Sequence, residues 1–325
     1  MPDLVLDVAD LALAATVRRA TFAPVTDAQV SVRAGEVVGL VGESGSGKSL
    51  TALTVLSLLP DQVSRTAGSV KVEDQEVAEL DERGLARLRG AVAAIVFQDS
   101  LSSLNPTMTI GRQVEETVRV HRDCDRATAR AAAIEALELV GFPQPHERYD
   151  SYPHQLSGGL RQRVAIAMAI ALRPRLLIAD EPTTALDVTI QAQILELLQR
   201  LARELDMGVL LITHDLGVIA SVTDRVTVMY AGRTVESCTT LEAFASPQHP
   251  YTQALVLSAP TLTGPADVVL QGIPGVLPDP RRPEPGCPYA PRCTRALDRC
   301  VTEIPVLVRT DERSVACFNP VGSDD

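Results

Sequence analysis

The sequence contains no tryptophan, and aromatic residues make up only 3% of its 325 residues. Its core must therefore be aliphatic, and an apolar fraction of 46% is enough to build one. The chain also lacks any run of about 18 apolar residues, the length that a membrane-spanning helix requires. Its first residues, Met-Pro-Asp-Leu, do not combine a basic stretch with an apolar one, so we expect no secretory signal.

Positive charge is scarce as well. The chain carries 30 Lys and Arg residues against 41 Asp and Glu residues, which gives a net charge of −11. A nucleic-acid partner would need a basic face to neutralise phosphates. The composition therefore argues against such a partner and indicates a solvated acidic surface. Without a signal or a span, the chain is expected in the cytoplasm, where disulfides are disfavoured.

The apolar pattern changes along the chain. Residues 3–41 alternate apolar and polar side chains in short segments, which predicts half-buried antiparallel strands, and residues 36–42 form a more continuous apolar strand that ends in glycine. The other expected elements are helices within 49–59, 81–173 and 188–205, strands at 176–179 and 209–212, and a hairpin that turns at 231–232. Strands that alternate with helices indicate an α/β fold with a mostly parallel sheet.

Proline concentrates at the C-terminal end. Of the 22 prolines, 11 lie between Pro260 and the end of the chain. Each proline removes a backbone donor and fixes φ, so long regular helices are excluded there. We therefore expect two parts, a domain of residues 1–257 and a loop-rich extension of residues 258–325.

A glycine-rich segment carries the first chemical motif. Residues 42–49 match the phosphate-loop pattern G-x-x-x-x-G-K-[ST] at every fixed position. Glycines let backbone N–H groups turn towards phosphate oxygens, Lys48 adds a positive charge, and the Ser49 hydroxyl can ligate Mg²⁺. A chance match in an unrelated loop is the alternative, but the strand before and the helix after are the context that the motif requires. The expected nucleotide-binding residues are Gly42, Ser44, Gly45, Gly47, Lys48, Ser49 and Leu50.

Two carboxylates follow the apolar strand at 176–179. Asp180 and Glu181 stand at its C-terminal end, where α/β sheets place their sites. Asp180 is suited to hold Mg²⁺, directly or through water, and Glu181 to polarise the attacking water as a general base. A strand followed by an acidic helix cap is the alternative, and Pro182 would also fit it. The phosphate loop upstream favours the catalytic interpretation.

A third motif offers a second anion-binding surface. Residues 156–163 read Leu-Ser-Gly-Gly-Leu-Arg-Gln-Arg. Ser-Gly-Gly alone is an ordinary helix start. Ser157, Gly158 and Gly159 nevertheless present a hydroxyl and unobstructed amides at a helix N-terminus. A chain needs two phosphate-binding surfaces if ATP is to be held between two subunits.

With these motifs in this order, residues 1–255 resemble the ATPase subunits of ABC transporters. Three more residues fall where that family has functional ones: Gln98 in Val-Phe-Gln-Asp, Asp187 in Thr-Ala-Leu-Asp and His214 in Ile-Thr-His-Asp. The resemblance implies that Gln98 senses Mg²⁺ and the attacking water, that Asp187 contacts the partner's site, and that His214 bonds the γ-phosphate.

The resemblance also implies a fold and its cofactors. The fold would be the ABC ATPase fold, an α/β architecture with a mostly parallel core, an antiparallel β subdomain and a helical subdomain that carries the signature motif. The cofactors would be ATP and Mg²⁺, with Ser49, Gln98 and Asp180 around the metal. Glu181, His214 and Gln98 would be the catalytic residues. All of them are present, so we expect a site that hydrolyses ATP.

Further segments resemble the oligopeptide, dipeptide and nickel branch of ABC importers. They are residues 103–111, 189–193, 228–232 and 249–252. In that branch the segment after Gln98 meets a membrane-spanning partner. The alternative for its apolar residues, Leu104 and Met108, is simple packing in the core.

Four cysteines in the extension suggest a metal site. Cys287, Cys293, Cys300 and Cys317 are separated by five, six and sixteen residues. Zinc ribbons usually pair ligands as C-x₂-C, and no such pair occurs. Four thiolates on an irregular scaffold suit a [4Fe–4S] cluster, which some members of the resembled family bind. Zinc and reduced structural thiols are the alternatives, and Cys124 and Cys238 are taken as ordinary residues.

One feature of the family is missing. Importer ATPases usually stack an aromatic residue on adenine, and the alignment places Ala15 at that position. Phe22 is the candidate substitute from a displaced loop. If neither stacks, adenine binding loses about 1–3 kcal/mol.

The sequence therefore predicts the ATP-hydrolysing subunit of an importer for di- and oligopeptides, at the cytoplasmic face of the membrane. Its expected partners are a related ATPase subunit, two membrane-spanning permeases and an extracytoplasmic solute-binding protein. A nickel or other small-solute importer is the first alternative. A soluble ABC protein that acts on nucleic acid or ribosomes is a more distant one, because the basic surface and the second ATPase domain of such proteins are missing.

Overall fold

The computed structural model of the chain describes residues 3–18, 20–98, 103–184, 186–258, 272–310 and 312–322. These residues form two compact units. Unit 1 comprises residues 1–6, 32–37 and 72–211, and unit 2 comprises residues 7–31, 38–71 and 212–325. Within the described ranges, no helix is long and apolar enough to cross a membrane.

The main strands of unit 1 are aliphatic and almost completely buried. They are β6 (Ala93–Val96), β7 (Leu176–Asp180) and most of β8 (Gly208–Ile212), in the spatial order β6-β7-β8, with a short β5 (Gln75–Glu76) apart from them. β6 and β7 run parallel, with Val96 opposite Ala179. Continuous apolar strands of this kind are typical of parallel sheets covered on both faces. β6 lies in the region whose pattern predicts mainly helix, because four residues are too few to change that pattern.

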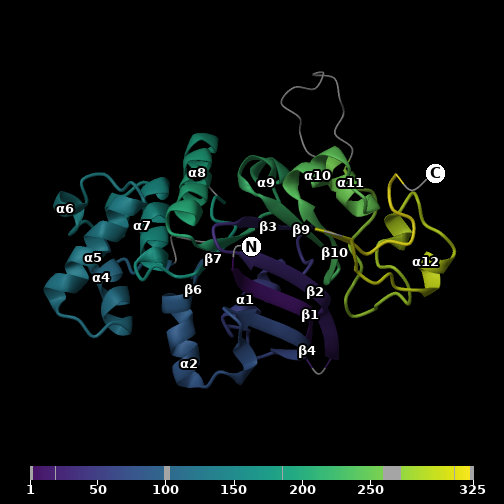
Figure 1. Cartoon of the computed structure of the whole chain (residues 1–325), viewed down its shortest axis with the longest axis horizontal. Helices are drawn as coiled ribbons and strands as arrows, with labels where there is room; N and C mark the ends of the chain where they lie inside the picture. The colour runs from purple at the N-terminus through teal and green to yellow at the C-terminus, as the bar shows by residue number, and fades with distance from the viewer. Residues whose placement is uncertain are drawn as a thin grey trace. The chain divides into compact units, whose positions relative to one another are not determined.

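The helices of unit 1 begin at polar caps. They are α2 (Glu82–Arg87), α4 (Ile110–His121), α5 (Arg126–Leu139), α6 (Pro145–Arg148), α7 (Gly158–Ile170) and α8 (Val188–Glu204). At the start of α5, the Asp125 carboxylate accepts a hydrogen bond from the Thr128 backbone N–H at 2.8 Å, which satisfies one of the unpaired donors of the first turn. Helices α4, α5 and α7 pack against one another around aliphatic side chains (Figure 1).

Unit 2 is built on a mixed sheet. All or most of β1 (Leu4–Val17), β2 (Ala20–Arg33), β3 (Val37–Val41), β4 (Val63–Val72), β9 (Arg225–Tyr230) and β10 (Arg233–Thr239) lie in it, in the order β4-β1-β2-β10-β9-β3. β3 and β9 are parallel, as are β2 and β10, whereas β9 and β10 form the expected antiparallel hairpin. The helices of this unit are α1 (Lys48–Val55), α9 (Leu216–Val222), α10 (Thr240–Ala245), α11 (Pro250–Ser258) and α12 (Arg299–Thr302).

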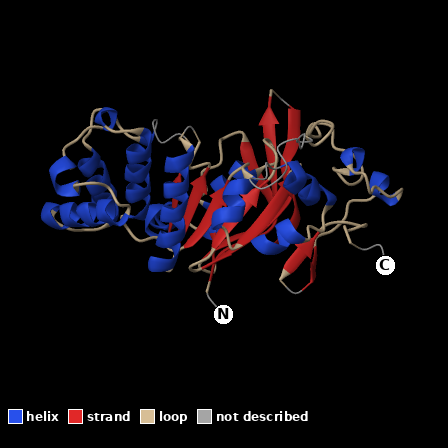
Figure 2. Cartoon of the chain, turned by 90° about the horizontal axis from the view of Figure 1, so that it is seen from above, coloured by secondary structure: helices blue, strands red, loops and turns tan. Residues whose placement is uncertain are grey.

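The proline-rich tail, here residues 272–322, belongs to unit 2. It is loop-rich as expected, with the short helix α12 and two short strands, β11 (Val308–Thr310) and β12 (Arg313–Val315) (Figure 2). β12 pairs antiparallel with β10, with Val315 opposite Glu236. The tail thus extends the sheet of unit 2. The expected domain boundary at 257/258 adjoins residues 259–271, which lie outside the described ranges.

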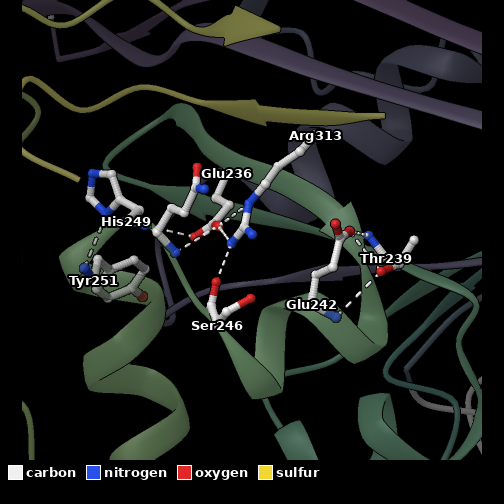
Figure 3. A network of polar contacts seen from close by, with 8 residues as sticks. Glu236, Thr239, Glu242, Ser246, His249, Tyr251 and Arg313 are labelled. Atoms are coloured by element: carbon white, nitrogen blue, oxygen red, sulfur yellow. Dashed lines mark hydrogen bonds and ion pairs between the residues drawn. The ribbon is translucent and has the colours of Figure 1, made fainter. Parts of the chain in front are cut away.

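A buried carboxylate fixes the tail to the sheet. Glu236 on β10 is fully buried and accepts hydrogen bonds from the backbone N–H groups of Gln248 and His249, at 3.0 and 2.9 Å. Arg313 on β12 donates to the same carboxylate through Nε at 3.1 Å and bonds the Ser246 carbonyl (Figure 3). A buried charge is tolerated only when it is paired and hydrogen-bonded. This network therefore joins β10, the start of α11 and the tail.

Candidate functional site

The phosphate loop follows β3 and leads into α1. Gly42 has a φ of 150° and Gly47 a φ of 99°. A Cβ atom at Gly42 would lie 2.1 Å from the Met229 carbonyl oxygen, and one at Gly47 would lie 2.8 Å from a Val25 methyl group. Both positions therefore require glycine, for backbone conformation and for space. The predicted loop is formed by the described residues, at the end of a buried strand and at a helix N-terminus.

The residues of the loop differ in how far they are exposed to solvent. Lys48 is buried, and its Nζ donates to the carbonyl oxygens of Gly42 and Glu43 at 2.8 and 2.9 Å. Ser44, Gly45 and Ser49 are exposed, and Leu50 is half-buried. The Ser49 hydroxyl is thus accessible in the first turn of α1, as a Mg²⁺ ligand at this position would need to be.

Glu43 is a loop residue that the motif does not specify, and the structure shows that it contacts Tyr251 and Arg292. Its backbone N–H donates to the Tyr251 hydroxyl at 2.8 Å. Its carboxylate accepts two bonds from the Arg292 guanidinium, at 2.8 and 2.9 Å, and Arg292 also donates to the Tyr230 hydroxyl at 3.3 Å. A bidentate pair of this kind fixes orientation as well as distance. The tail therefore holds the phosphate loop through Arg292, which lies next to Cys293. A variable position in a motif gives no sequence signal for such a contact.

The two carboxylates predicted to act in catalysis, Asp180 and Glu181, lie at the C-terminal end of β7 in unit 1. Because β6 and β7 are parallel with Val96 opposite Ala179, the residues two positions later leave the sheet at the same edge. The Gln98 Nε2 amide donates to Glu181 Oε2 at 2.7 Å, and the Thr184 hydroxyl donates to the same oxygen at 3.1 Å. Asp180 is the last residue of β7 and is half-buried. The structure thus brings the predicted base and the predicted glutamine into contact.

Glu181 also has a distinctive backbone. Its φ is 46°, in the left-handed region that side chains other than glycine seldom adopt. Strained φ values persist only where surrounding contacts impose them, and they cluster at functional sites. The bonds from Gln98 and Thr184 supply such contacts.

The signature segment, residues 156–163, contains the start of helix α7. Ser157 is the N-cap residue, and its Oγ accepts a hydrogen bond from the Leu160 N–H at 3.4 Å. A Cβ atom at Gly159 would lie 2.5 Å from an Ile190 methyl group on α8, so glycine permits close packing of the two helices. Gly158 is half-buried and Ser157 is exposed. Asp187 caps α8 by accepting from the Ile190 N–H at 3.0 Å.

His214 lies in unit 2, two residues beyond β8 and before α9. It is exposed, and the neighbouring Asp215 caps α9 by accepting from the Gly217 N–H at 2.8 Å. The predicted residues are therefore found in two sets. Unit 1 holds Gln98, Ser157, Gly158, Gly159, Asp180, Glu181 and Asp187, and unit 2 holds the phosphate loop and His214.

The segment after Gln98 is described from residue 103. Leu104 is buried, so for this residue the packing alternative is correct, whereas Met108 is only half-buried. Gln113 on α4 fixes the segment, because its amide donates to the carbonyl oxygens of Asn105 and Met108 at 3.0 Å. In the rest of the segment, Ser103, Asn105, Pro106 and Thr107 are exposed, whereas residues 109–111 are buried.

The four tail cysteines line one small cavity, together with His249 and Tyr289. Burial, together with charge on neighbouring cysteines of the set, raises the pKa of the Cys287, Cys293 and Cys317 thiols, to about 11 for Cys317. The sulfurs of Cys300 and Cys317 accept backbone N–H bonds at 3.4 Å. Cys300 is buried and the other three cysteines are half-buried. A raised pKa keeps a thiol protonated unless a cation stabilises its thiolate.

The cavity does not, however, form a ready site for one ion. Among the described residues, no group of three or more His, Cys, Asp or Glu side chains is placed to hold a metal ion. A single zinc ion would draw four sulfurs to about 2.3 Å from one centre, whereas a cluster spreads its ligands over four irons. The thiols share a cavity without converging on one point.

The residue at the expected adenine-stacking position cannot stack. Ala15 on β1 is 5% exposed, so neither its size nor its burial allows it to cover a base. Phe22, on β2, is half-buried and lines a cavity beside the phosphate loop.

Comparisons with known proteins identify the family. The family model "ABC transporter" matches residues 25–184, and the model "Oligopeptide/dipeptide transporter, C-terminal region" matches residues 235–300. The chain is similar to the oligopeptide transport ATP-binding protein AppD of Bacillus subtilis, with 46% identity over 87% of each chain. It is also similar to a putative peptide import ATP-binding protein of Brucella abortus, with 49% identity over 90% of this chain and 88% of the relative.

Solved structures match the fold. A dimer of the ATP-binding cassette MJ0796 bound to ADP and phosphate gives a TM-score of 0.64 at 27% identity, over 72% of this chain and 98% of the other. CbiO1 of Clostridium perfringens, part of the transporter complex CbiONQ, gives 0.66 at 27% identity, over 75% and 92%. The predicted ABC ATPase fold is confirmed. The chain belongs to the ATP-binding proteins of the ABC transporter family, in the branch that carries the oligopeptide/dipeptide transporter C-terminal region.

Proposed function

We propose that this chain hydrolyses ATP at the cytoplasmic face of the membrane to power the uptake of di- and oligopeptides. The main support for hydrolysis is the hydrogen bond from Gln98 to Glu181. This bond holds a carboxylate at the end of a parallel strand with an amide beside it. Peptide as the solute is supported by the relatives, which are named for oligopeptide transport and peptide import over most of their length. The matched C-terminal region supports the same branch.

The proposed roles are those that the motifs and the family predict. The loop amides and Lys48 would bind phosphates, and Ser49, Gln98 and Asp180 would hold Mg²⁺, which when bound would offset the charge on the phosphoryl oxygens. Glu181 accepts the proton of the attacking water. His214 bonds the γ-phosphate from unit 2.

The surface formed by Ser157, Gly158 and Gly159 supports a second ATPase subunit as a partner. Ser157, Gly158 and Gly159 present a helix N-terminus that suits an anion, and Asp187 belongs to the same surface. The similar cassette MJ0796 is described as a dimer, which supports a head-to-tail pair in which each subunit completes the other's site. A related but non-identical ATPase is the proposed partner. Two permeases, reached through residues 103–111, and an extracytoplasmic solute-binding protein complete the importer.

Peptide uptake by cells is the direct test of the solute. Cells that lack this chain are complemented with the wild type or with Glu181→Gln, and uptake of labelled di- and oligopeptides is measured beside uptake of nickel. We expect peptide uptake to return only with the wild type, with nickel uptake unchanged throughout. Restoration of nickel uptake alone would favour the nickel alternative. Co-purification with ribosomes or nucleic acid instead of permeases would favour the soluble alternative.

We also propose that Cys287, Cys293, Cys300 and Cys317 hold a [4Fe–4S] cluster. The shared cavity and the backbone N–H bonds to two of the sulfurs support this proposal. A cluster would supply four iron–thiolate bonds that cross-link a segment too small to form its own core. Zinc remains the alternative occupant.

Metal analysis distinguishes the two occupants. Chain purified without oxygen is expected to contain about four irons and four sulfides. Cys293→Ser should lower iron content and thermal stability together, whereas Cys124→Ser, outside the cavity, should change neither. One zinc per chain without iron would contradict the cluster, and a metal content unaffected by Cys293→Ser would contradict the ligand assignment.

A further inference from the structure

A cavity of ≈ 290 Å³ adjoins the phosphate loop within unit 2. This volume lies just below the range for small-molecule sites, which begins at about 300 Å³. Gly45 of the loop forms part of its wall, Phe22 of β2 forms another part, and the tail closes it with Leu277 and Arg281. Two segments far apart in sequence therefore meet beside the loop.

The residues that line this cavity are suited to binding a flat aromatic ligand. Its walls are largely apolar, with several prolines and with Leu277, and a small number of polar groups that include Thr26 and Asp279. The Arg281 guanidinium carbon lies 5.5 Å from the centroid of the Phe22 ring. Aromatic rings such as that of Phe22 and guanidinium planes such as that of Arg281 are protein surfaces on which nucleobases stack.

The tail segment that carries Arg281 is held in place. The Asp279 side chain accepts from the Arg281 backbone N–H at 3.0 Å, and its carbonyl accepts from the Arg282 N–H at 2.9 Å, which makes a turn. Further along, Arg292 ties the tail to Glu43 of the loop. The same segment thus contacts the phosphate loop and one wall of the cavity.

We propose that Phe22 and Arg281 bind the base of the nucleotide, so that the C-terminal tail forms part of the nucleotide site. This inference rests on the proposed binding of ATP phosphates by the loop. Because the loop at Gly45 forms part of the cavity wall, a nucleotide whose phosphates lie on the loop has its base within reach of the cavity. The buried Ala15 provides no stacking surface, and the tail supplies one in its place.

Affinities for ATP and for inorganic tripolyphosphate separate base binding from phosphate binding. Both are measured calorimetrically with Mg²⁺ on the full chain. Phe22→Ala is expected to weaken ATP binding roughly 10-fold and Arg281→Ala about 3- to 10-fold, and neither should change tripolyphosphate binding. Arg281→Lys should not restore affinity, because an ammonium group is not planar. Arg282→Ala, on the neighbouring exposed residue, is the matched control and should bind ATP like the wild type.

The possible outcomes distinguish base binding by Phe22 and Arg281 from the phosphate binding by the loop on which this inference rests. Wild-type ATP affinity in Phe22→Ala and Arg281→Ala would overturn base binding by the tail and leave phosphate binding intact. Equal losses for ATP and tripolyphosphate would also overturn it, because they would show that these residues support the loop and not the base. Lys48→Ala should weaken both ligands, and if it weakened neither, the proposed function of the loop would fail instead.

Discussion

Replacing Glu181 by Gln is expected to leave ATP binding unchanged and to lower the rate of hydrolysis by about 10²–10⁴-fold, the usual contribution of a positioned general base. The amide keeps the size of the carboxylate and can still accept the bond from Gln98, but it cannot take a proton from water. Calorimetric ATP binding and steady-state phosphate release, on the full chain and on its complex with membrane partners, measure the two effects.

Neighbouring substitutions provide the controls for this result. Thr184→Ala removes one of the two bonds to Glu181 Oε2 and should lower the rate less than Glu181→Gln, because the base itself remains. Gln98→Ala should lower the rate and also weaken the dependence on Mg²⁺. Full turnover by Glu181→Gln would remove this residue as the base, and loss of ATP binding would show that it acts earlier than the chemical step.

Replacing Arg313 by Ala is expected to lower the free energy of unfolding by about 3–5 kcal/mol, because it leaves the Glu236 carboxylate buried without its charged partner. Glu236 is fully buried and the Arg313 side chain is 11% exposed, so solvent offers little compensation. Denaturant titration of the full chain measures the change. The loss should be accompanied by detachment of the tail from β10, seen as faster proteolysis after residue 271.

A double-mutant cycle separates this pair from general disruption. Glu236→Gln removes the charge and keeps one acceptor oxygen, so it retains the bond from one of the two N–H groups of Gln248 and His249; this loss is common to both variants made in that background. In that background Arg313→Ala should cost much less than in the wild type, because no buried charge is left unpaired. An equal cost in both backgrounds would show that Arg313 acts through packing and not through Glu236.

The sequence predicts this site better than it predicts the surroundings of the site. Gly42, Lys48 and Glu181 belong to motifs whose chemistry dictates their spacing, so their places at strand ends follow from the fold class. The contact between Gln98 and Glu181 depends on the register of β6 and β7. Register is set by packing across the sheet. The sequence does not reveal the four-residue β6, because the residues around it follow a helical pattern.

The contacts of the tail, by contrast, could not be predicted from the sequence. Its prolines correctly predict irregular structure, but they do not indicate that β12 pairs with β10 or that Arg292 bonds Glu43. Both contacts join residues more than 75 positions apart. Glu43 and Arg281 occupy positions without any motif, so only their spatial neighbours identify them. Long-range pairing of polar side chains is the part of a fold that a local pattern does not encode.

Peptide transport in a reconstituted system tests the central claim most directly. The chain, its partner ATPase and the permeases are placed in liposomes with the solute-binding protein, and accumulation of a labelled oligopeptide is measured with and without ATP. Wild-type complex should accumulate peptide only with ATP, and the Glu181→Gln complex should accumulate none. ATP-independent accumulation, or equal accumulation by both complexes, would contradict the claim that ATP hydrolysis by this chain drives peptide import.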